Sequence, residues 1–319
     1  MAVSMKHYTF VDYATQGYTA LVAVIILMLH GDVVPGWGWY VGAHLLCLGL
    51  VHALIFASAA RPANTTLDFL RHFYPVLLYT AFYSETGKLN QMAYTGYLDG
   101  MLLKLEHELF GGQPSLHFML AFPQRWVGEV LYFSYFSYYL MIIGVGLALF
   151  LRERRQFYHY VSVVSFVFYA CYLTYIFVPV IGPRMGQPDM VPMELPPEVP
   201  PEAEWVVPAT VQSSVFYRVM VLIYHHFETP GAAFPSSHVA IALVTVYFSF
   251  LYLRKIRWLH LVLAVLLGFA TVYGRYHYVV DVIAGVLTTA LMLPLGNWLY
   301  ARFGVERRRP KPPPPTARS

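Results

Sequence analysis

Charged residues are scarce in this chain of 319 residues, where they make up only 12% of the sequence. Hydrophobic residues account for 58%, and an ordinary soluble domain cannot bury so much apolar surface. The composition therefore excludes a soluble globular protein and predicts one that lies in a lipid bilayer. The formal net charge of +4 is small, so we expect no nucleic-acid partner.

Cysteine is nearly absent as well, because only Cys47 and Cys171 occur and both lie within apolar stretches. We expect them to pack as small hydrophobic residues and not to form a disulfide or bind metal. The run Glu106-His107-Glu108 would point in different directions on a helix, and His225-His226 have no third ligand at a suitable spacing. The sequence thus predicts neither a metal nor another cofactor.

Long apolar runs are what the sequence has in abundance. A helix needs about 20 mostly apolar residues to cross a bilayer, and we place about eight such spans near 16–31, 38–59, 69–84, 129–151, 158–181, 236–254, 257–275 and 278–301. The predicted fold is therefore all-α, a polytopic membrane bundle with interfacial helices on the outer face.

Basic residues gather in alternate loops of this arrangement. Short cytoplasmic loops are enriched in Lys and Arg, and such residues follow the fourth, sixth and eighth spans, at 152–155, 254–257 and 302–309. We therefore predict an integral protein of the cell membrane with both termini in the cytoplasm. The loops at 85–128, 182–235 and 275–278 then lie on the non-cytoplasmic face.

Three segments are not expected to span. A helical pattern near 97–110 predicts an interfacial helix, and a second one at 209–228 is expected to lie over the outer loops. We divide the chain into N-terminal spans (1–180), a catalytic part (181–302) with an outer lid loop at 183–234, and a Pro-rich cytoplasmic tail (303–319) that we expect to be disordered.

Polar residues capable of chemistry stand at the outer mouths of the last spans. Pro235-Ser236-Ser237-His238 begins the sixth span, and a helix start of this kind suits an anionic phosphate, although the serines alone would also serve as caps. His277 and Asp281 are four residues apart, so on a helix they share a face, and the carboxylate can orient the imidazole as a nucleophile. A plain interhelical hydrogen bond is the alternative for this pair.

Two arginines supply positive charge on the same predicted side. Arg184 follows the fifth span and Arg275 precedes the eighth, and either could hold a phosphate or extend to the membrane interface. Their convergence with His238 and His277 at one depth favours the phosphate.

These motifs resemble those of the type 2 phosphatidic acid phosphatase superfamily of lipid phosphatases and phosphotransferases. The resemblance lies in Gly182-Pro183-Arg184, in Pro235-Ser236-Ser237-His238 and in His277-Tyr278-Val279-Val280-Asp281, and covers about residues 181–285. The chain differs in lacking the usual lysine of the first motif and in having Thr271 where the third motif usually has arginine. Together with Asp99, these differences are more similar to the branch that includes inositol phosphorylceramide synthases.

The resemblance implies a metal-independent reaction on a lipid phosphate or diphosphate through a phosphohistidine. His277 would attack, Asp281 would orient it, and His238 would protonate the leaving oxygen. Binding of the phosphate would fall to Arg184, Arg275, Ser236 and Ser237.

Three alternatives stay open at the level of sequence. Water as the acceptor gives a phosphatase, whereas an alcohol acceptor gives a phosphotransferase or a phospholipid headgroup transferase. A catalytically silent lipid-binding or transport protein is a third reading, against which the set of His238, His277 and Asp281 argues.

Overall fold

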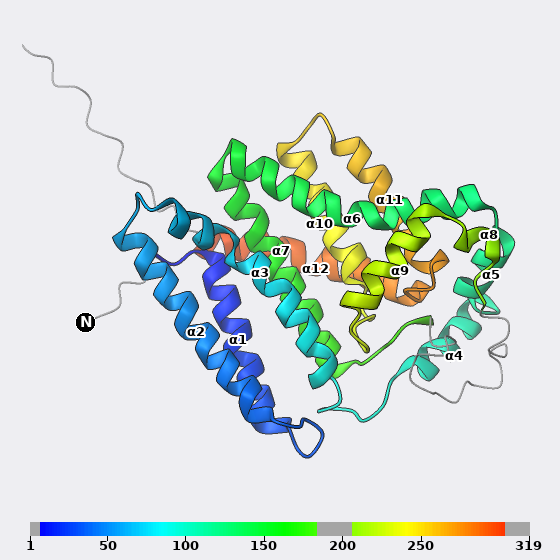
Figure 1. Ribbon diagram of the computed structural model, residues 1–319, viewed down its shortest axis with the longest axis horizontal. Helices are drawn as coiled ribbons and strands as arrows, with labels where there is room; N and C mark the ends of the chain where they lie inside the picture. Colours follow the sequence, from blue (N-terminus) through cyan, green and yellow to red (C-terminus); the bar gives the residue numbers. More distant parts are fainter. Residues whose placement is uncertain (1–6, 184–205, 304–319) are drawn as a thin grey trace, which may run out of the picture.

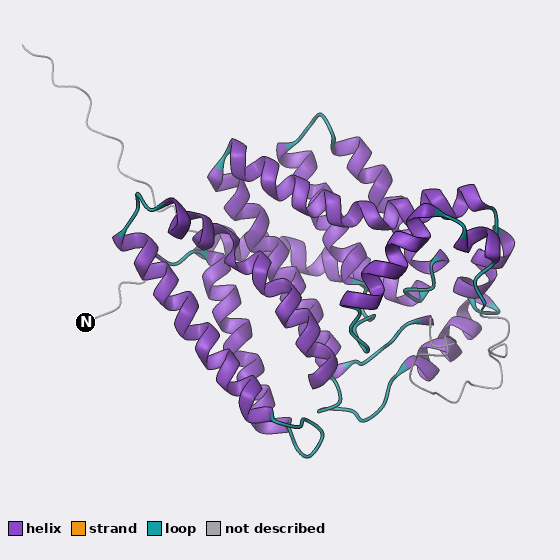
Figure 2. Ribbon diagram, in the orientation of Figure 1, coloured by secondary structure: helices purple, strands orange, loops and turns teal. Residues whose placement is uncertain are grey.

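The computed structural model describes residues 7–183 and 206–303, and these residues fold almost wholly into helices (Figure 1). The twelve helices of the described part are α1 (Phe10–Leu29), α2 (Trp37–Ala60), α3 (Thr65–Leu89), α4 (Asp99–Phe110), α5 (Pro114–Ala121), α6 (Arg125–Arg152), α7 (Arg154–Phe177), α8 (Ala209–Gln212), α9 (Val215–Phe227), α10 (Ser237–Tyr252), α11 (Arg257–Tyr273) and α12 (Val279–Phe303). Figure 2 shows helices and loops alone in this part of the chain. The prediction of an all-α polytopic membrane bundle is confirmed.

Each predicted span coincides with one helix, namely α1, α2, α3, α6, α7, α10, α11 or α12. Among the described residues, five of these helices are long and apolar enough to cross a membrane: α1, α2, α6, α7 and α12. The apolar helices α10 and α11 are shorter, with 16 and 17 residues, or roughly 25 Å at the usual rise per residue. The total of eight crossings stays a prediction.

Polar side chains at the ends of several helices explain where they begin. The Asn64 side chain accepts a hydrogen bond from the Leu67 N–H at 2.9 Å and starts α3. The Glu153 side chain likewise accepts a hydrogen bond from the Arg155 N–H and starts α7. Such caps satisfy N–H groups that have no partner within the helix.

Helix α7 lies in the middle of the bundle and packs against α1, α3, α6, α10 and α12 (Figure 1). Its contacts are largely aromatic, and Tyr175 near its end is fully buried. The helix begins at Arg154 and ends at Phe177, so it connects the two ends of the bundle. Arg154 and Arg155 lie beside Arg61 and Arg71 at one end, while the Tyr175 hydroxyl donates to the Pro235 carbonyl at the other.

The two segments expected to lie in the interface are helical. Residues 97–110 contain α4, and residues 209–228 contain α8 and α9. Helix α4 exposes the apolar side chains of Met101, Leu105 and Leu109 but buries the acids Asp99 and Glu106. Leu102 and Leu103 are buried beside these acids, whereas Lys104 and Glu108 are exposed. The exposed face of α4 is therefore mixed polar and apolar, which fits a helix in the membrane interface.

Candidate active site

Two loop segments meet at the end of the bundle where α10 and α12 begin. The first is residues 179–182 and the second is residues 231–236, joined by hydrogen bonds from Val180 N–H to the Gly231 carbonyl (3.3 Å) and from Ala233 N–H to the Val180 carbonyl (2.8 Å). The second segment is tied to α12, because the Ser236 N–H donates to the Asp281 carbonyl at 3.0 Å. The motifs that are separated in sequence are therefore adjacent in space.

Two glycines allow this close approach. Gly182 has a φ of +100°, and a Cβ there would lie 2.6 Å from the Tyr276 carbonyl oxygen. A Cβ on Gly285 of α12 would lie 2.6 Å from the Ser236 carbonyl oxygen. Neither position has room for a side chain, since the opposing atoms are backbone.

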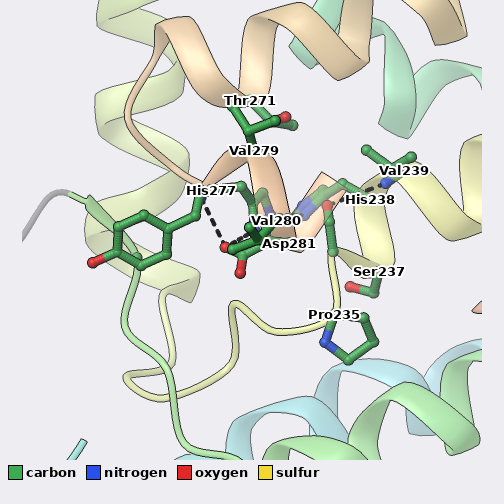
Figure 3. Close-up of polar contacts among 12 residues, drawn as sticks. Pro235, Ser237, His238, Val239, Thr271, His277, Val279, Val280 and Asp281 are labelled. Atoms are coloured by element: carbon green, nitrogen blue, oxygen red, sulfur yellow. Dashed lines mark hydrogen bonds and ion pairs between the residues drawn. The ribbon is translucent and has the colours of Figure 1, made fainter. Parts of the chain in front are cut away.

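His277 and Asp281 contact each other, with 3.3 Å between His277 Nδ1 and Asp281 Oδ2 (Figure 3). The backbone differs from the expected shared helix face, because His277 lies in the turn before α12 and only Asp281 is within the helix. Asp281 Oδ2 also accepts the Tyr278 N–H at 2.9 Å, and the Thr271 carbonyl accepts the His277 N–H at 3.1 Å. The Asp281 carboxylate thus caps the start of α12 and at the same time fixes the orientation of the His277 imidazole.

His238 is in the first turn of α10 and faces His277. Its Nδ1 lies 3.3 Å from His277 Nε2, and its Nε2 lies 3.2 Å from the Tyr135 hydroxyl of α6. The Tyr135 hydroxyl in turn contacts that of Tyr224 on α9. One arrangement of protons satisfies the whole row: Tyr135 donates to His238, His238 donates to His277, and His277 donates to an ionised Asp281. In that arrangement both imidazoles are neutral.

The serines of the second motif differ in their surroundings. The Ser236 hydroxyl accepts the Val239 N–H at 3.4 Å and caps α10, whereas Ser237 lines a cavity. The Tyr175 hydroxyl accepts the Ser237 N–H at 3.3 Å and donates to the Pro235 carbonyl at 3.1 Å. Two N–H groups at the start of α10 are therefore already bonded within the protein.

Of the two predicted arginines, Arg275 is described and Arg184 lies outside the described residues. Arg275 is 3% exposed and has a φ of 61°, a conformation uncommon for a residue with a side chain. Burial lowers the pKa of its guanidinium, and the nearby phenols of Tyr132, Tyr217 and Tyr273 oppose that shift. The structure thus places a buried positive charge in the turn that carries His277.

Asp99, which the sequence linked only to a family resemblance, joins two of the motifs through its carboxylate. Its oxygens accept hydrogen bonds from the N–H groups of Ile181 (2.9 Å) and Gly182 (2.8 Å) and from the Tyr278 hydroxyl (3.1 Å). Burial raises the pKa of Asp99 to about 6, against the effect of these hydrogen bonds. Asp99 therefore fixes the first motif relative to the third.

Glu106 is the second acid of α4 that reaches the site, where it contacts the start of α12 and not a metal site of the kind that Glu106-His107-Glu108 might suggest. One oxygen, Oε1, accepts from the N–H groups of both Val279 and Val280 at the start of α12, the latter at 3.2 Å. Burial raises the pKa of Glu106 to about 7. Its spacing of seven residues from Asp99 on the buried face of a helix was the available signal.

An apolar cavity of about 480 Å³ opens beside His238. Its wall comes from α3, α6, α7, α9 and the start of α10, and its members are mostly aromatic or aliphatic: Val76, Tyr79, Thr80, Tyr83, Phe136, Tyr138, Tyr139, Ile142, Ile143, Phe168, Tyr172, Ile223, Tyr224, Phe227, Glu228, Ser237 and His238. Within residues 7–183 and 206–303, no three His, Cys, Asp or Glu side chains are grouped as metal ligands. The arrangement can therefore place a long apolar group beside two imidazoles.

A family model described as the PAP2 superfamily matches residues 100–295. The match covers more than half of the chain and includes α4 after Asp99 as well as all three motifs. No curated protein and no solved structure matches. The resemblance to this superfamily is thereby confirmed, whereas the narrower resemblance to the inositol phosphorylceramide synthase branch stays a prediction.

Proposed function

Because this chain belongs to the PAP2 superfamily, we propose that it removes or transfers the phosphoryl group of a lipid phosphate or diphosphate through a phosphohistidine intermediate. The observation that carries the proposal is the row of Asp281, His277 and His238 at the mouth of an apolar cavity. A phosphatase or phosphotransferase acting on phosphate esters is the activity of the family, and the lipid substrate and the intermediate are our inference for this chain.

His277 is the proposed nucleophile. Its Nδ1 contacts Asp281, so the Nδ1 proton stays on that side and Nε2 keeps its lone pair. In the first step, the His277 Nε2–phosphorus bond forms as the bond from phosphorus to the leaving oxygen breaks. The buried Asp281 carboxylate stabilises the positive charge that develops on the ring.

His238 is the proposed acid and base. It gives a proton to the leaving oxygen in the first step, and in the second step it takes a proton from the water or alcohol that attacks phosphorus as the bond to His277 breaks. In-line transfer puts phosphorus between nucleophile and acid, which requires roughly 7 Å between the two nitrogens. They are 3.3 Å apart here, so substrate binding must separate the rings.

The negative oxygens of the phosphate need fixed positive charge nearby. We assign this role to Arg275 in the His277 turn, to Arg184 and to the start of α10 with Ser236 and Ser237. A buried guanidinium interacts strongly with an anion because little water screens it. The same charge would stabilise the transition state more than the bound substrate when it is aligned with the equatorial oxygens.

The cavity beside His238 supplies the argument for a lipid. It is lined mostly by apolar side chains of helices that also have lipid-facing surfaces, such as α6. A hydrocarbon chain placed there keeps its phosphate near the histidines. We further propose that the site faces the non-cytoplasmic side of the cell membrane with both termini in the cytoplasm, as the distribution of basic loops indicates.

Phosphate release from long-chain lipid phosphates and diphosphates tests this function. Purified protein is assayed with excess chelator, beside a His277→Ala variant and a Tyr138→Phe variant, in which a ring packed 4.8 Å from His238 loses only its hydroxyl. We expect release by the wild-type and Tyr138→Phe proteins and none by His277→Ala. Equal release by the wild type and His277→Ala would exclude the proposed nucleophile.

Hydrolysis and transfer are distinguished by the acceptor. No release from wild type in water, together with a new phosphorylated product when a lipid alcohol is added, would identify a transferase of the inositol-phosphorylceramide-synthase-like kind.

Because one histidine must be protonated and the other neutral, turnover should follow a bell-shaped pH profile. A rate that changes in one direction from acid to alkaline pH would contradict the paired roles.

A further inference from the structure

A second cavity, of about 440 Å³, lies at the end of the bundle away from His277. Its wall is formed by the start of α1, the end of α2, the starts of α3 and α7, and the end of α12. The wall contains two carboxylates, those of Asp68 and Glu153, and four arginines, Arg61, Arg71, Arg154 and Arg155. The cavity therefore has an excess of positive charge.

Three helices direct their N-terminal ends at this cavity. Thr9, Asn64 and Glu153, which precede α1, α3 and α7, are all in its wall. The start of a helix carries a partial positive charge. Three such starts add to the field of the arginines, so the cavity attracts anions.

Arg71 provides independent support for a ligand. It is 6% exposed, and its Nη2 contacts the carboxylate of Asp12, which also accepts from the Tyr74 hydroxyl at 2.6 Å. The other nitrogen, Nη1, is buried and has no hydrogen-bond partner among the described residues. A buried N–H without an acceptor is costly, and an anion in the cavity would supply that acceptor.

We propose that this cavity binds the phosphorylated headgroup of an anionic membrane lipid. Its volume suits a headgroup larger than a phosphate ion. It lies at the ends of membrane helices, where Ile55 and Ala59 give it an apolar wall, and Phe69 and Leu70, which follow Asp68 on α3, are exposed. The acyl chains can therefore lie along α2 and α3 while the phosphate contacts the arginines.

The site is distinct from the catalytic one. Twenty residues of α7 separate Arg155 at the arginine cavity from Tyr175 beside the second motif, which is roughly 30 Å along a helix. The proposal thus does not depend on the proposed enzymatic function. The two cavities lie at different levels along α7, one beside Arg154, Arg155 and Tyr158 and the other beside Phe168 and Tyr172.

Binding of dioctanoyl phosphatidylinositol phosphate to the purified full chain tests the proposal. The probe is titrated in neutral detergent, in a His277→Ala background that prevents turnover. Arg61→Gln with Arg154→Gln removes two exposed charges from the cavity, and Arg254→Gln with Lys255→Gln removes two exposed charges from the loop between α10 and α11. Arg154→Gln alone serves as a second variant should the double change impair folding.

We expect the cavity variant to bind the probe roughly tenfold more weakly or worse, and the loop variant to bind within about twofold of the parent. Equal weakening in both double variants would show attraction to net charge alone and overturn the proposal. Unchanged binding in the cavity variants would place the lipid elsewhere, which also overturns it. Competition by inorganic phosphate at the probe's own concentration would replace the lipid by a free anion and overturn the assignment to a lipid.

Discussion

Asp99 and Glu106 should respond very differently to loss of charge, although both are buried acids of one helix. Asp99 uses both oxygens, one for Ile181 and the other for Gly182 and Tyr278. Glu106 uses a single oxygen for both of its partners, and its Oε2 has no partner among the described residues. An amide has one accepting oxygen and one NH₂ group, so Glu106→Gln can keep every hydrogen bond and Asp99→Asn cannot.

The magnitude follows from the bonds lost. In Asp99→Asn the best orientation keeps the Gly182 and Tyr278 bonds and turns the NH₂ group toward the Ile181 N–H. One buried N–H loses its acceptor, at about 1–3 kcal/mol, and two charge-assisted bonds become neutral ones. We expect the free energy of unfolding to fall by about 2–4 kcal/mol in Asp99→Asn and by less than about 1 kcal/mol in Glu106→Gln.

Thermal unfolding in detergent and phosphate release from a lipid phosphate, measured on both variants, check this. Asp99→Asn should be less stable and much less active, because Ile181 loses its acceptor and the first motif is no longer fixed as firmly against the third. Tyr278→Phe is the matched control, since it removes only one of the three bonds to Asp99. Equal stability and activity in Asp99→Asn and Glu106→Gln would refute the reasoning.

Three further predictions concern the same region. Burial raises the pKa of Glu106 from 4.5 to about 7, so the folded state favours the protonated carboxyl. The stability that Glu106 contributes in this form is fully present below about pH 4.5 and is lost as pH rises through 7. The loss is about 3 kcal/mol, and stability measured from pH 5 to 8 should lose this slope in Glu106→Gln. Tyr135→Phe removes the hydroxyl bonded to His238, and turnover should fall about two- to tenfold; an unchanged rate would argue against a positioning role. Ile142→Trp fills the cavity beside His238 and should favour shorter acyl chains in competition assays, whereas Leu140→Trp, on the exposed surface of α6, should not.

Much of the bundle could be predicted because its signals are local. Apolar runs of about 20 residues mark helices whatever their neighbours, and each predicted span coincides with a helix. The contact between His277 and Asp281 was also predictable from a spacing of four residues, although His277 proved to precede α12. Its backbone depends on the Thr271 carbonyl and on the cap by Asp281, which a helical pattern does not encode.

The supporting acids could not be predicted in the same way. Asp99 contacts residues 82 and 179 positions further along the chain, and no periodicity links such distant positions. The tyrosines of this row, Tyr135 beside His238 and Tyr224 beside Tyr135, could not be predicted for another reason. A chain with 26 tyrosines offers no means of choosing these two from the sequence. Only the packing of α6 against α10 and of α9 against α6 selects them.

The shortness of α10 and α11 bears on how far the proposed lipid substrate would have to move in order to react. At roughly 25 Å they fall short of a hydrocarbon core of about 30 Å, whereas α7 has 24 residues and spans it with room to spare. His238, in the first turn of α10, would then lie deeper than the lipid headgroups, at a place where the bilayer is locally thinner. The phosphate of the proposed lipid substrate could then reach His238 while its hydrocarbon chains stay in the bilayer, and each methylene that is not drawn into water would spare about 0.8 kcal/mol. On this geometry the reaction requires water at the depth of His238, and it does not require the lipid to leave the bilayer.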